Sequence, residues 1–285
     1  MLLAGGVARL LDAALGRIER RRFPDGETYL RFAQDVSGRD VVLLAQLGRP
    51  DDKLFPLALA AATARELGAR RVGLIAPYLP YMRQDTRFHP GEAVSAGHAL
   101  RLIAGGVDWL VTVDPHLHRI GDLSDICQIP ATVAHAAPAL AEWVAGHVRN
   151  PLLIGPDGES AQWVKTVAHD ARAPFCVLSK RRLGDRAVEL TLPDLAPHAG
   201  RTPVLVDDII SSGATMLAAA AKLRAAGFAA PVVIAVHALF ARGAYDALGA
   251  VAAQVASTNS LPHRSNAIDL AGVMAAAARR HLDSR

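Results

Sequence analysis

The sequence predicts an α/β fold of two similar domains, each a mainly parallel sheet flanked by helices. Short, uniformly apolar runs such as residues 72–76 and 204–206 alternate with alanine-rich helical stretches. Uniform apolarity is typical of strands that are buried on both faces of a parallel sheet. The succession of strand, polar turn, helix and glycine also occurs twice, because a spacing of 159 residues separates both Gly68 from Gly227 and Ile75 from Ile234. We therefore expect two copies of one unit.

The first domain is expected to span residues 1–135. A short strand is predicted at residues 2–4 and a helix at residues 7–15, whose leucines share one face. Asp25-Gly26 marks a turn within residues 19–27, ahead of an alternating edge strand at residues 28–32. Apolar runs predict buried strands at residues 41–45, 72–76 and 109–113, and the helices between them, at residues 51–67 and 95–104, end at glycines.

The second domain is expected to span residues 136–285, with the boundary within residues 132–138. A single continuous sheet is the alternative arrangement. The same reasoning predicts helices at residues 136–148, 161–169, 216–226 and 267–280, and strands at residues 152–154, 175–178, 204–206, 232–236 and 251–257. The basic residues within 180–186 predict a charged loop.

The composition limits the possible partners. Hydrophobic residues make up 51% of the 285 residues, so a substantial core can form. The net charge is +4, and the basic residues stand in short clusters, whereas a nucleic-acid-binding protein concentrates them in a stripe. Cys127 and Cys176 have no metal-ligand spacing. Since neither a membrane-length apolar run nor a secretory signal is present, we expect a cytoplasmic protein with no membrane partner.

One stretch carries the strongest chemical signal. An apolar strand at residues 204–206 leads into Asp207 and Asp208, and a small polar loop follows where the next helix begins. A helix N-terminus offers unpaired N–H groups and a positive dipole end, which suit a phosphate. Two adjacent carboxylates would repel that phosphate unless sugar hydroxyls or a divalent cation satisfied them. The stretch therefore predicts a site for a phosphorylated sugar; a plain capped helix is the alternative.

This loop resembles the phosphoribosyl-pyrophosphate (PRPP) binding loop of the phosphoribosyltransferase fold. The resemblance implies that Asp207 and Asp208 bind the ribose hydroxyls. It also implies that the small residues of the loop surround the 5-phosphate; they are Ser211, Ser212, Gly213, Ala214 and Thr215.

Six segments in order resemble the ribose-phosphate diphosphokinase (PRPP synthetase) family. They are residues 23–27, 83–85, 113–116, 156–157, 180–182 and 207–215. The stretch of residues 83–95 is similar to the compact archaeal type, without the longer insertion of the bacterial type. The resemblance implies two phosphoribosyltransferase-type domains, the first on the nucleotide side and the second with the PRPP loop. It implies the reaction of ATP with ribose 5-phosphate to give PRPP and AMP.

The resemblance also implies roles for individual residues. Lys180 and Arg182 would stabilise the charge of the transferred group, and His116 and Asp157 would bind Mg²⁺, the expected cofactor. The turn with Phe23, Asp25 and Glu27 would recognise adenine. The segment Arg83, Gln84 and Asp85 is also expected to bind the nucleotide. Arg49 occupies the place of a diphosphate-facing loop in the first copy of the repeated unit.

The family places the turn at residues 23–27 in a neighbouring subunit's site, which implies a homodimer or a larger homo-oligomer. Two departures from the family pattern leave other readings open: residues 158–160, where many members have Gly-Gly, and Ser211-Ser212. The alternatives are a diphosphokinase with a different donor or acceptor, a catalytically silent regulatory homologue and a nucleobase phosphoribosyltransferase. The silent homologue should lack the cations or the acids, which are present here, and the phosphoribosyltransferase would not need two copies of the fold.

Overall fold

A computed structural model describes residues 3–117, 119–182 and 188–283 of the chain. The chain divides into two units. Unit 1 comprises Met1–His135 together with Ala271–Arg285, and unit 2 comprises Ala136–Leu270. No helix within the described residues is long and apolar enough to cross a membrane.

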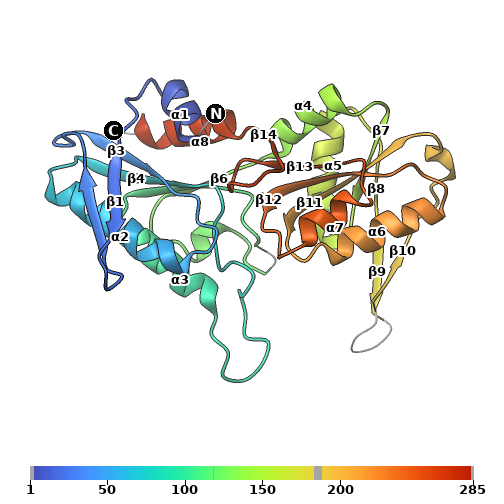
Figure 1. Ribbon diagram of the computed structural model, residues 1–285, viewed down its shortest axis with the longest axis horizontal. Coiled ribbons are helices and arrows are strands. Elements are labelled where there is room, and N and C mark those ends of the chain that lie inside the picture. The colour runs from blue at the N-terminus through green and yellow to red at the C-terminus, as the bar shows by residue number, and fades with distance from the viewer. Residues whose placement is uncertain (1–2, 118, 183–187, 284–285) are drawn as a thin grey trace. The chain divides into compact units, whose positions relative to one another are not determined.

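Unit 1 is built on a four-stranded parallel sheet in the order β3-β4-β5-β6. Its strands are β3 (Asp40–Leu44), β4 (Arg71–Ala76), β5 (Trp109–Val113) and β6 (Ala131–Ala134). Figure 1 shows helices on both faces of this sheet; they are α2 (Asp51–Glu66) and α3 (Ser95–Ala104) on one face, and α1 (Leu3–Leu10) and α8 (Ala271–Leu282) on the other. The buried residues of β4 and β5 are almost all apolar, as a sheet covered on both faces requires.

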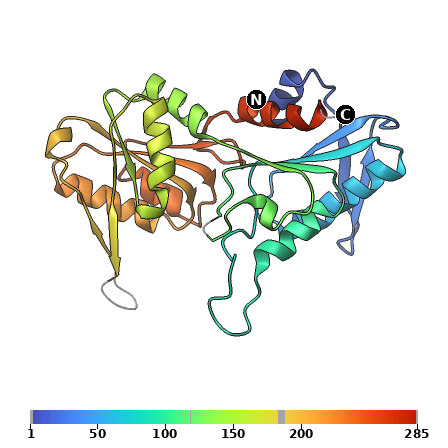
Figure 2. The same cartoon turned by 180° about the vertical axis from the view of Figure 1, so that it is seen from behind.

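Unit 2 is built on a six-stranded parallel sheet in the order β14-β13-β12-β11-β7-β8. Its strands are β7 (Pro151–Gly155), β8 (Phe175–Val177), β11 (Thr202–Ile210), β12 (Val232–Ala238), β13 (Gln254–Thr258) and β14 (Asn266–Ile268). Figures 1 and 2 show two helices on each face; they are α4 (Ala137–His147) and α5 (Ala161–Asp170), and α6 (Ala214–Ala225) and α7 (Ala244–Gly249).

The two sheets share one topology. In unit 2, β11 pairs with β12, β12 with β13 and β13 with β14, all parallel, and β3 to β6 pair in the same succession in unit 1. The helices between the first two strands, α2 and α6, are both followed by a glycine with a positive φ, Gly68 and Gly227. The predicted fold class, two similar α/β domains with mainly parallel sheets, is therefore confirmed.

Several short segments differ from the predicted elements; for example, β14 lies where the predicted last helix was expected to begin. Residues 2–4 were expected to form a strand, but residues from Leu3 onward form α1, because Gly6 allows α1 to lie close to α8: an added Cβ would stand 3.0 Å from the Cβ of Ala271. The turn predicted at residues 19–27 is the end of a hairpin, β1 (Ile18–Arg22) with β2 (Thr28–Phe32). The charged loop at residues 180–186 starts as a strand, β9 (Ser179–Arg182), because it pairs with β10 (Val188–Thr191).

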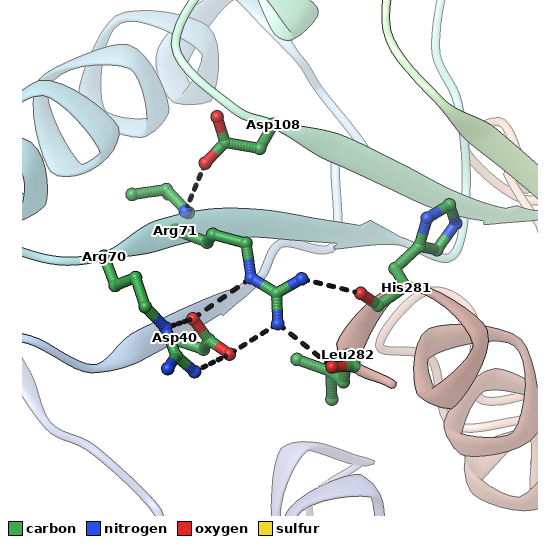
Figure 3. Close-up of polar contacts among 7 residues, drawn as sticks. Asp40, Arg70, Arg71, Asp108, His281 and Leu282 are labelled. Carbon is green, nitrogen blue, oxygen red and sulfur yellow. Dashed lines mark hydrogen bonds and ion pairs between the residues drawn. The ribbon is translucent and has the colours of Figure 1, made fainter. Parts of the chain in front are cut away.

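The last helix corrects the predicted domain of residues 136–285, because α8 packs in unit 1 against α1, β5 and β6. The imidazole of His281 stacks on Trp109, with ring centroids 5.0 Å apart, and its Nε2 lies 2.9 Å from Thr132 Oγ1. Figure 3 shows that Arg71 joins the sheet to the end of α8. Its guanidinium donates to the carbonyl oxygens of His281 and Leu282, each at 3.0 Å, and to Asp40. These contacts satisfy carbonyls that a helix end leaves without partners.

Arg71→Ala should therefore destabilise unit 1 more than Arg70→Ala, although both arginines bind Asp40. Arg70 makes no such contact with α8 among the described residues, and its side chain is 64% exposed against 27% for Arg71. We expect Arg71→Ala to lower the free energy of unfolding by about 2 kcal/mol, and Arg70→Ala by about 1 kcal/mol or less. Urea unfolding measures both; equal losses would contradict a role of Arg71 in holding α8.

Candidate functional site

The loop from β11 to α6 has the geometry of an anion site. Gly213 precedes α6 with a φ of 73°, a left-handed conformation that favours glycine. A Cβ at this position would also stand 3.2 Å from Leu248 Cδ1, so the loop lies directly on α7. The carbonyl of Ser211 accepts a hydrogen bond from the N–H of Ala241 at 2.9 Å, which fixes the loop to the segment after β12. These contacts hold the loop at the point where α6 begins.

A cavity of about 150 Å³ opens at this loop. Its lining includes every loop residue that the sequence singled out, namely Ser211, Ser212, Gly213, Ala214 and Thr215, and also Asp207. Asp208, the second predicted acid, is not part of the lining. The cavity therefore joins a carboxylate at one end to backbone N–H groups and hydroxyls at the other, which suits a phosphorylated polyol.

Asp207 is in an unfavourable position for a charged group. Burial, the neighbouring carboxylate of Asp208 and the carboxylate of Asp157 together raise the pKa of Asp207 to about 8. Inside the protein, such repulsion is relieved by a cation or by hydroxyl groups that donate hydrogen bonds. The electrostatics of unit 2 therefore favour a ligand that brings one or both.

Asp157 is held in place by Ser160, three residues further along the chain. The hydroxyl of Ser160 donates to the carbonyl of Asp157 at 2.6 Å, and the N–H of Ser160 lies 3.3 Å from Asp157 Oδ1. Gly155 leaves room for this hydroxyl, because an added Cβ would stand 2.4 Å from Ser160 Oγ. The turn after β7 is therefore closed by Ser160.

The predicted catalytic cations lie on β9. Lys180 pairs with Leu190 and Arg182 with Val188 in the β9–β10 ladder, so the structure gives their backbone positions. Their side chains lie outside what the structure describes, and their roles stay predictions.

In unit 1, Arg49 lies in the loop between β3 and α2, the counterpart of the loop between β11 and α6. Arg49 is exposed and has a φ of 52°, which is unusual for a residue with a side chain. Burial, followed by the charges of Arg20 and Arg49, lowers the pKa of the Lys53 ammonium in the first turn of α2. An anion at this loop would offset the repulsion among these three cations.

The segment Arg83, Gln84 and Asp85 begins a loop between β4 and α3. The side chain of Arg83 is exposed and makes no hydrogen bond with other described residues, so it can reach a ligand. The side chain of Gln84 accepts from the hydroxyl of Ser95 at 3.1 Å. Asp85, by contrast, is already paired, because Arg119 Nη1 lies 2.9 Å from its Oδ1. Burial alone would raise the pKa of Asp85, but the hydrogen bonds from Arg119 outweigh it and hold that pKa below its ordinary value.

His116 follows β5 and is half-buried. Nearby, Asp114 has a φ of 35° and lies 2.9 Å from His135 Nδ1, at the end of β6. This hydrogen bond raises the pKa of His135, although burial opposes the shift. His116 lies in unit 1 and Asp157 in unit 2, so their joint binding of Mg²⁺ stays a prediction.

The predicted adenine-binding residues stand at the tip of the β1–β2 hairpin. The N–H of Phe23 donates to the carbonyl of Glu27 at 2.8 Å, and Asp25 Oδ1 accepts from the N–H of Glu27 at 3.1 Å. The ring of Phe23 is 39% exposed, and the guanidinium of Arg21 lies 4.6 Å from its centroid. Asp25 therefore shapes the turn, and Phe23 offers an accessible aromatic face.

Magnesium fits part of this donor set. The described residues contain no cluster of three or more His, Cys, Asp or Glu side chains placed as metal ligands. The carboxylates around Asp207 nevertheless provide oxygen donors whose mutual repulsion a divalent cation would relieve.

Three contacting residues were not singled out from the sequence: Tyr81, Arg119 and His135. The hydroxyl of Tyr81 donates to the carboxylate of Asp51. All three pair with residues at least 21 positions away. Arg119 could have been found, because it is a charged residue shortly after a buried strand, where sites in parallel sheets occur.

Residues 1–105 match the N-terminal domain of ribose phosphate pyrophosphokinase, and residues 123–255 match the phosphoribosyl transferase domain. A ribose-phosphate pyrophosphokinase of Sulfolobus acidocaldarius is 34% identical over 98% of this chain and 100% of its own length. One of Methanopyrus kandleri is 35% identical over 95% of this chain and 93% of its own.

Among solved structures, the phosphoribosylpyrophosphate synthetase of Mycobacterium smegmatis has the same fold, with a TM-score of 0.84. The match covers 99% of this chain and 96% of that chain at 24% identity. The repeated fold, the loop after β11 and nearly full-length similarity agree: the chain belongs to the ribose-phosphate pyrophosphokinase family.

Proposed function

We propose that this protein transfers the diphosphoryl group of ATP to the anomeric hydroxyl of ribose 5-phosphate, giving PRPP and AMP. The hydroxyl oxygen forms a bond to the β-phosphorus, the bond from that phosphorus to the oxygen bridging it to the α-phosphorus breaks, and the hydroxyl releases its proton. The single observation that carries the proposal is the cavity after β11, which combines a half-buried acid with a phosphate-type loop. Proteins named ribose-phosphate pyrophosphokinase match the chain over nearly its full length.

The cavity supports an orientation for the acceptor. The 5-phosphate would lie against the N–H groups of residues 213–215 and the hydroxyls of Ser211, Ser212 and Thr215, where the dipole of α6 favours negative charge. The ribose hydroxyls would donate to Asp207, and the adjacent Asp208 would assist in binding them. Binding both ends of the sugar fixes the anomeric hydroxyl, and such positioning is a large part of phosphoryl-transfer catalysis.

The donor would be bound mainly by unit 1. Arg83 would contact the phosphates, Gln84 the nucleoside, and Arg49 the diphosphate side. Phe23 and the backbone around Asp25 and Glu27 would recognise adenine in a neighbouring subunit of a homo-oligomer. Mg²⁺, bound by His116 and Asp157, would neutralise part of the charge on the polyphosphate.

Lys180 and Arg182 would act on the transferred group. Positive charge placed where negative charge spreads in the transition state lowers the barrier more than it strengthens substrate binding. The proposed compartment is the cytoplasm.

The first test is an assay of the purified protein with ATP, ribose 5-phosphate and Mg²⁺, with AMP and PRPP separated by chromatography. We expect equal amounts of the two products. AMP without PRPP would indicate another acceptor, and neither product despite ribose 5-phosphate binding would favour another donor or a silent homologue. PRPP consumption with a free nucleobase would indicate a phosphoribosyltransferase.

A second prediction concerns Lys180. Lys180→Ala should lower kcat by roughly 100-fold or more and change the KM for ATP by about threefold or less, as expected of a contact made in the transition state. Steady-state kinetics measures both. Lys165→Ala, which removes an exposed lysine on α5, is the control and should leave both constants unchanged. Equal changes in kcat and KM would instead place Lys180 in substrate binding.

A third prediction follows from the pKa of Asp207, which folding raises from 3.8 to about 8. The folded protein keeps a proton that the unfolded chain loses above about pH 4, so this contribution to stability declines as the pH rises towards 8. We compare the free energy of unfolding of Asp207→Asn with that of the unmodified protein. This difference should favour the variant by roughly 1–3 kcal/mol more at pH 8.5 than at pH 5.

Urea unfolding without ligands at both pH values measures this difference. Asp170→Asn, which changes an exposed carboxylate in the same unit, should show none. Asp207→Asn should also bind ribose 5-phosphate more weakly. A pH-independent effect on stability would contradict the unfavourable burial of Asp207.

A further inference from the structure

Arg119 makes an unusually complete contact with one carboxylate. Its Nη1 lies 2.9 Å from Asp85 Oδ1, and its backbone N–H donates to Asp85 Oδ2 at 3.1 Å. The side chain of Asp85 is 2% exposed, whereas that of Arg119 is 55% exposed. Both oxygens of an enclosed acid are therefore occupied by one residue from a different loop.

The rest of the loop between β4 and α3 is closed by its own contacts. Glu92 Oε2 accepts the N–H groups of Phe88 at 2.9 Å and His89 at 3.0 Å. The carbonyl of Gln84 accepts the N–H of Ala96 at 3.2 Å, which joins the start of the loop to α3. Because of these internal hydrogen bonds, a single contact from outside can fix the position of the whole loop.

Arg119 is the contact that joins this piece to the loop after β5. Besides binding Asp85, its guanidinium lies 5.2 Å from the centroid of the Phe88 ring. On the other side of Arg83, the hydroxyl of Tyr81 binds Asp51 on α2. Arg83 therefore stands between two anchored residues, while its own side chain is exposed.

We propose that Arg119 is a positioning residue for diphosphoryl transfer. Through Asp85 it fixes the loop that presents Arg83, and it joins that loop to the segment with His116. This inference rests on the proposed function, because it assigns the exposed Arg83 to the phosphates of ATP.

The consequence of losing Arg119 follows from the burial of its partner. Without the guanidinium, Asp85 keeps only backbone donors and an uncompensated charge, so the loop must rearrange to expose the carboxylate to water. The uncompensated charge of Asp85 would then stand beside the triphosphate of ATP, in place of the neutral ion pair of Asp85 with Arg119. ATP binding should suffer, whereas the ribose 5-phosphate loop in unit 2 contains neither residue.

The test compares Arg119→Ala, Arg119→Lys, Asp85→Asn and the double variant Asp85→Asn/Arg119→Ala. Arg65→Ala is the control, because Arg65 is also a partly exposed arginine of unit 1 and binds Asp108 at 2.8 Å, but its partner carboxylate is 36% exposed, not enclosed. That pair lies near the amino end of β5, away from the carboxyl ends that carry the candidate site. The measurements are kcat, the KM values for both substrates, the calorimetric Kd of Mg²⁺–ATP and the melting temperature.

We expect Arg119→Ala to raise the KM and Kd for ATP about tenfold, which corresponds to about 1.4 kcal/mol. The KM for ribose 5-phosphate should change by about twofold or less. The double variant should be no worse than either single variant, as for two residues that act as a pair. Arg119→Lys should restore part of the affinity, and Arg65→Ala should behave like the unmodified protein.

Several outcomes would overturn the proposal. Unchanged ATP constants in Arg119→Ala would do so directly, and equal losses for both substrates would indicate a general structural role. A loss in Arg119→Ala with normal Asp85→Asn would mean that Arg119 contacts the nucleotide itself. If the unmodified protein binds ATP without making PRPP, the proposed function fails, while the Kd ratios still decide the role of Arg119; absence of ATP binding overturns both.

Discussion

The site depends on one constraint of the parallel sheet, namely that all strands end at the same edge. Arg49 follows β3, Arg83 follows β4, and His116 and Arg119 follow β5. In unit 2, Asp157 follows β7 and the phosphate-type loop follows β11. Because the central strands are buried along most of their length, most polar side chains stand at or beyond the ends of these strands. Within each unit, residues far apart in the sequence therefore come to the same edge of the sheet, and loops can vary without disturbing the core.

The same constraint explains why binding and stability oppose each other at Asp207. The acid lies within the last part of β11, close enough to the core that burial raises its pKa to about 8. An exposed acid would not carry this cost, but it would also meet its ligand in competition with water. Ser160 and Asp157 show a related arrangement after β7, where the hydroxyl of Ser160 holds the turn that carries Asp157. The pocket is prepared for positive or hydrogen-bonding partners before they arrive.

The sequence predicted most of the fold because buried strands and glycine-terminated helices have local signals. Apolar runs located β4, β5, β7 and β12, and Gly68 and Gly227 ended α2 and α6. Local signals failed where distant contacts decide the structure. Leu3 is helical because α1 packs on α8, and Lys180 is in a strand because residue 190 pairs with it. At the candidate site, the cavity-lining residues came from one continuous stretch, whereas Arg119 and Asp85 are 34 residues apart and no spacing rule joins them.

Each copy of the repeat ends with a helix that packs in the other unit: α4 follows β6 but belongs to unit 2, and α8 follows β14 but belongs to unit 1. The contact of Arg71 with His281 joins residues 210 positions apart. During synthesis, the sheet of unit 1 emerges first, yet the face on which α8 packs is completed only when α8 leaves the ribosome. Unit 2 can close before that moment, since α4 precedes its strands. Unit 1 is thus made first but completed last. Because each unit includes a helix that follows the sheet of the other, the two units depend on each other in folding.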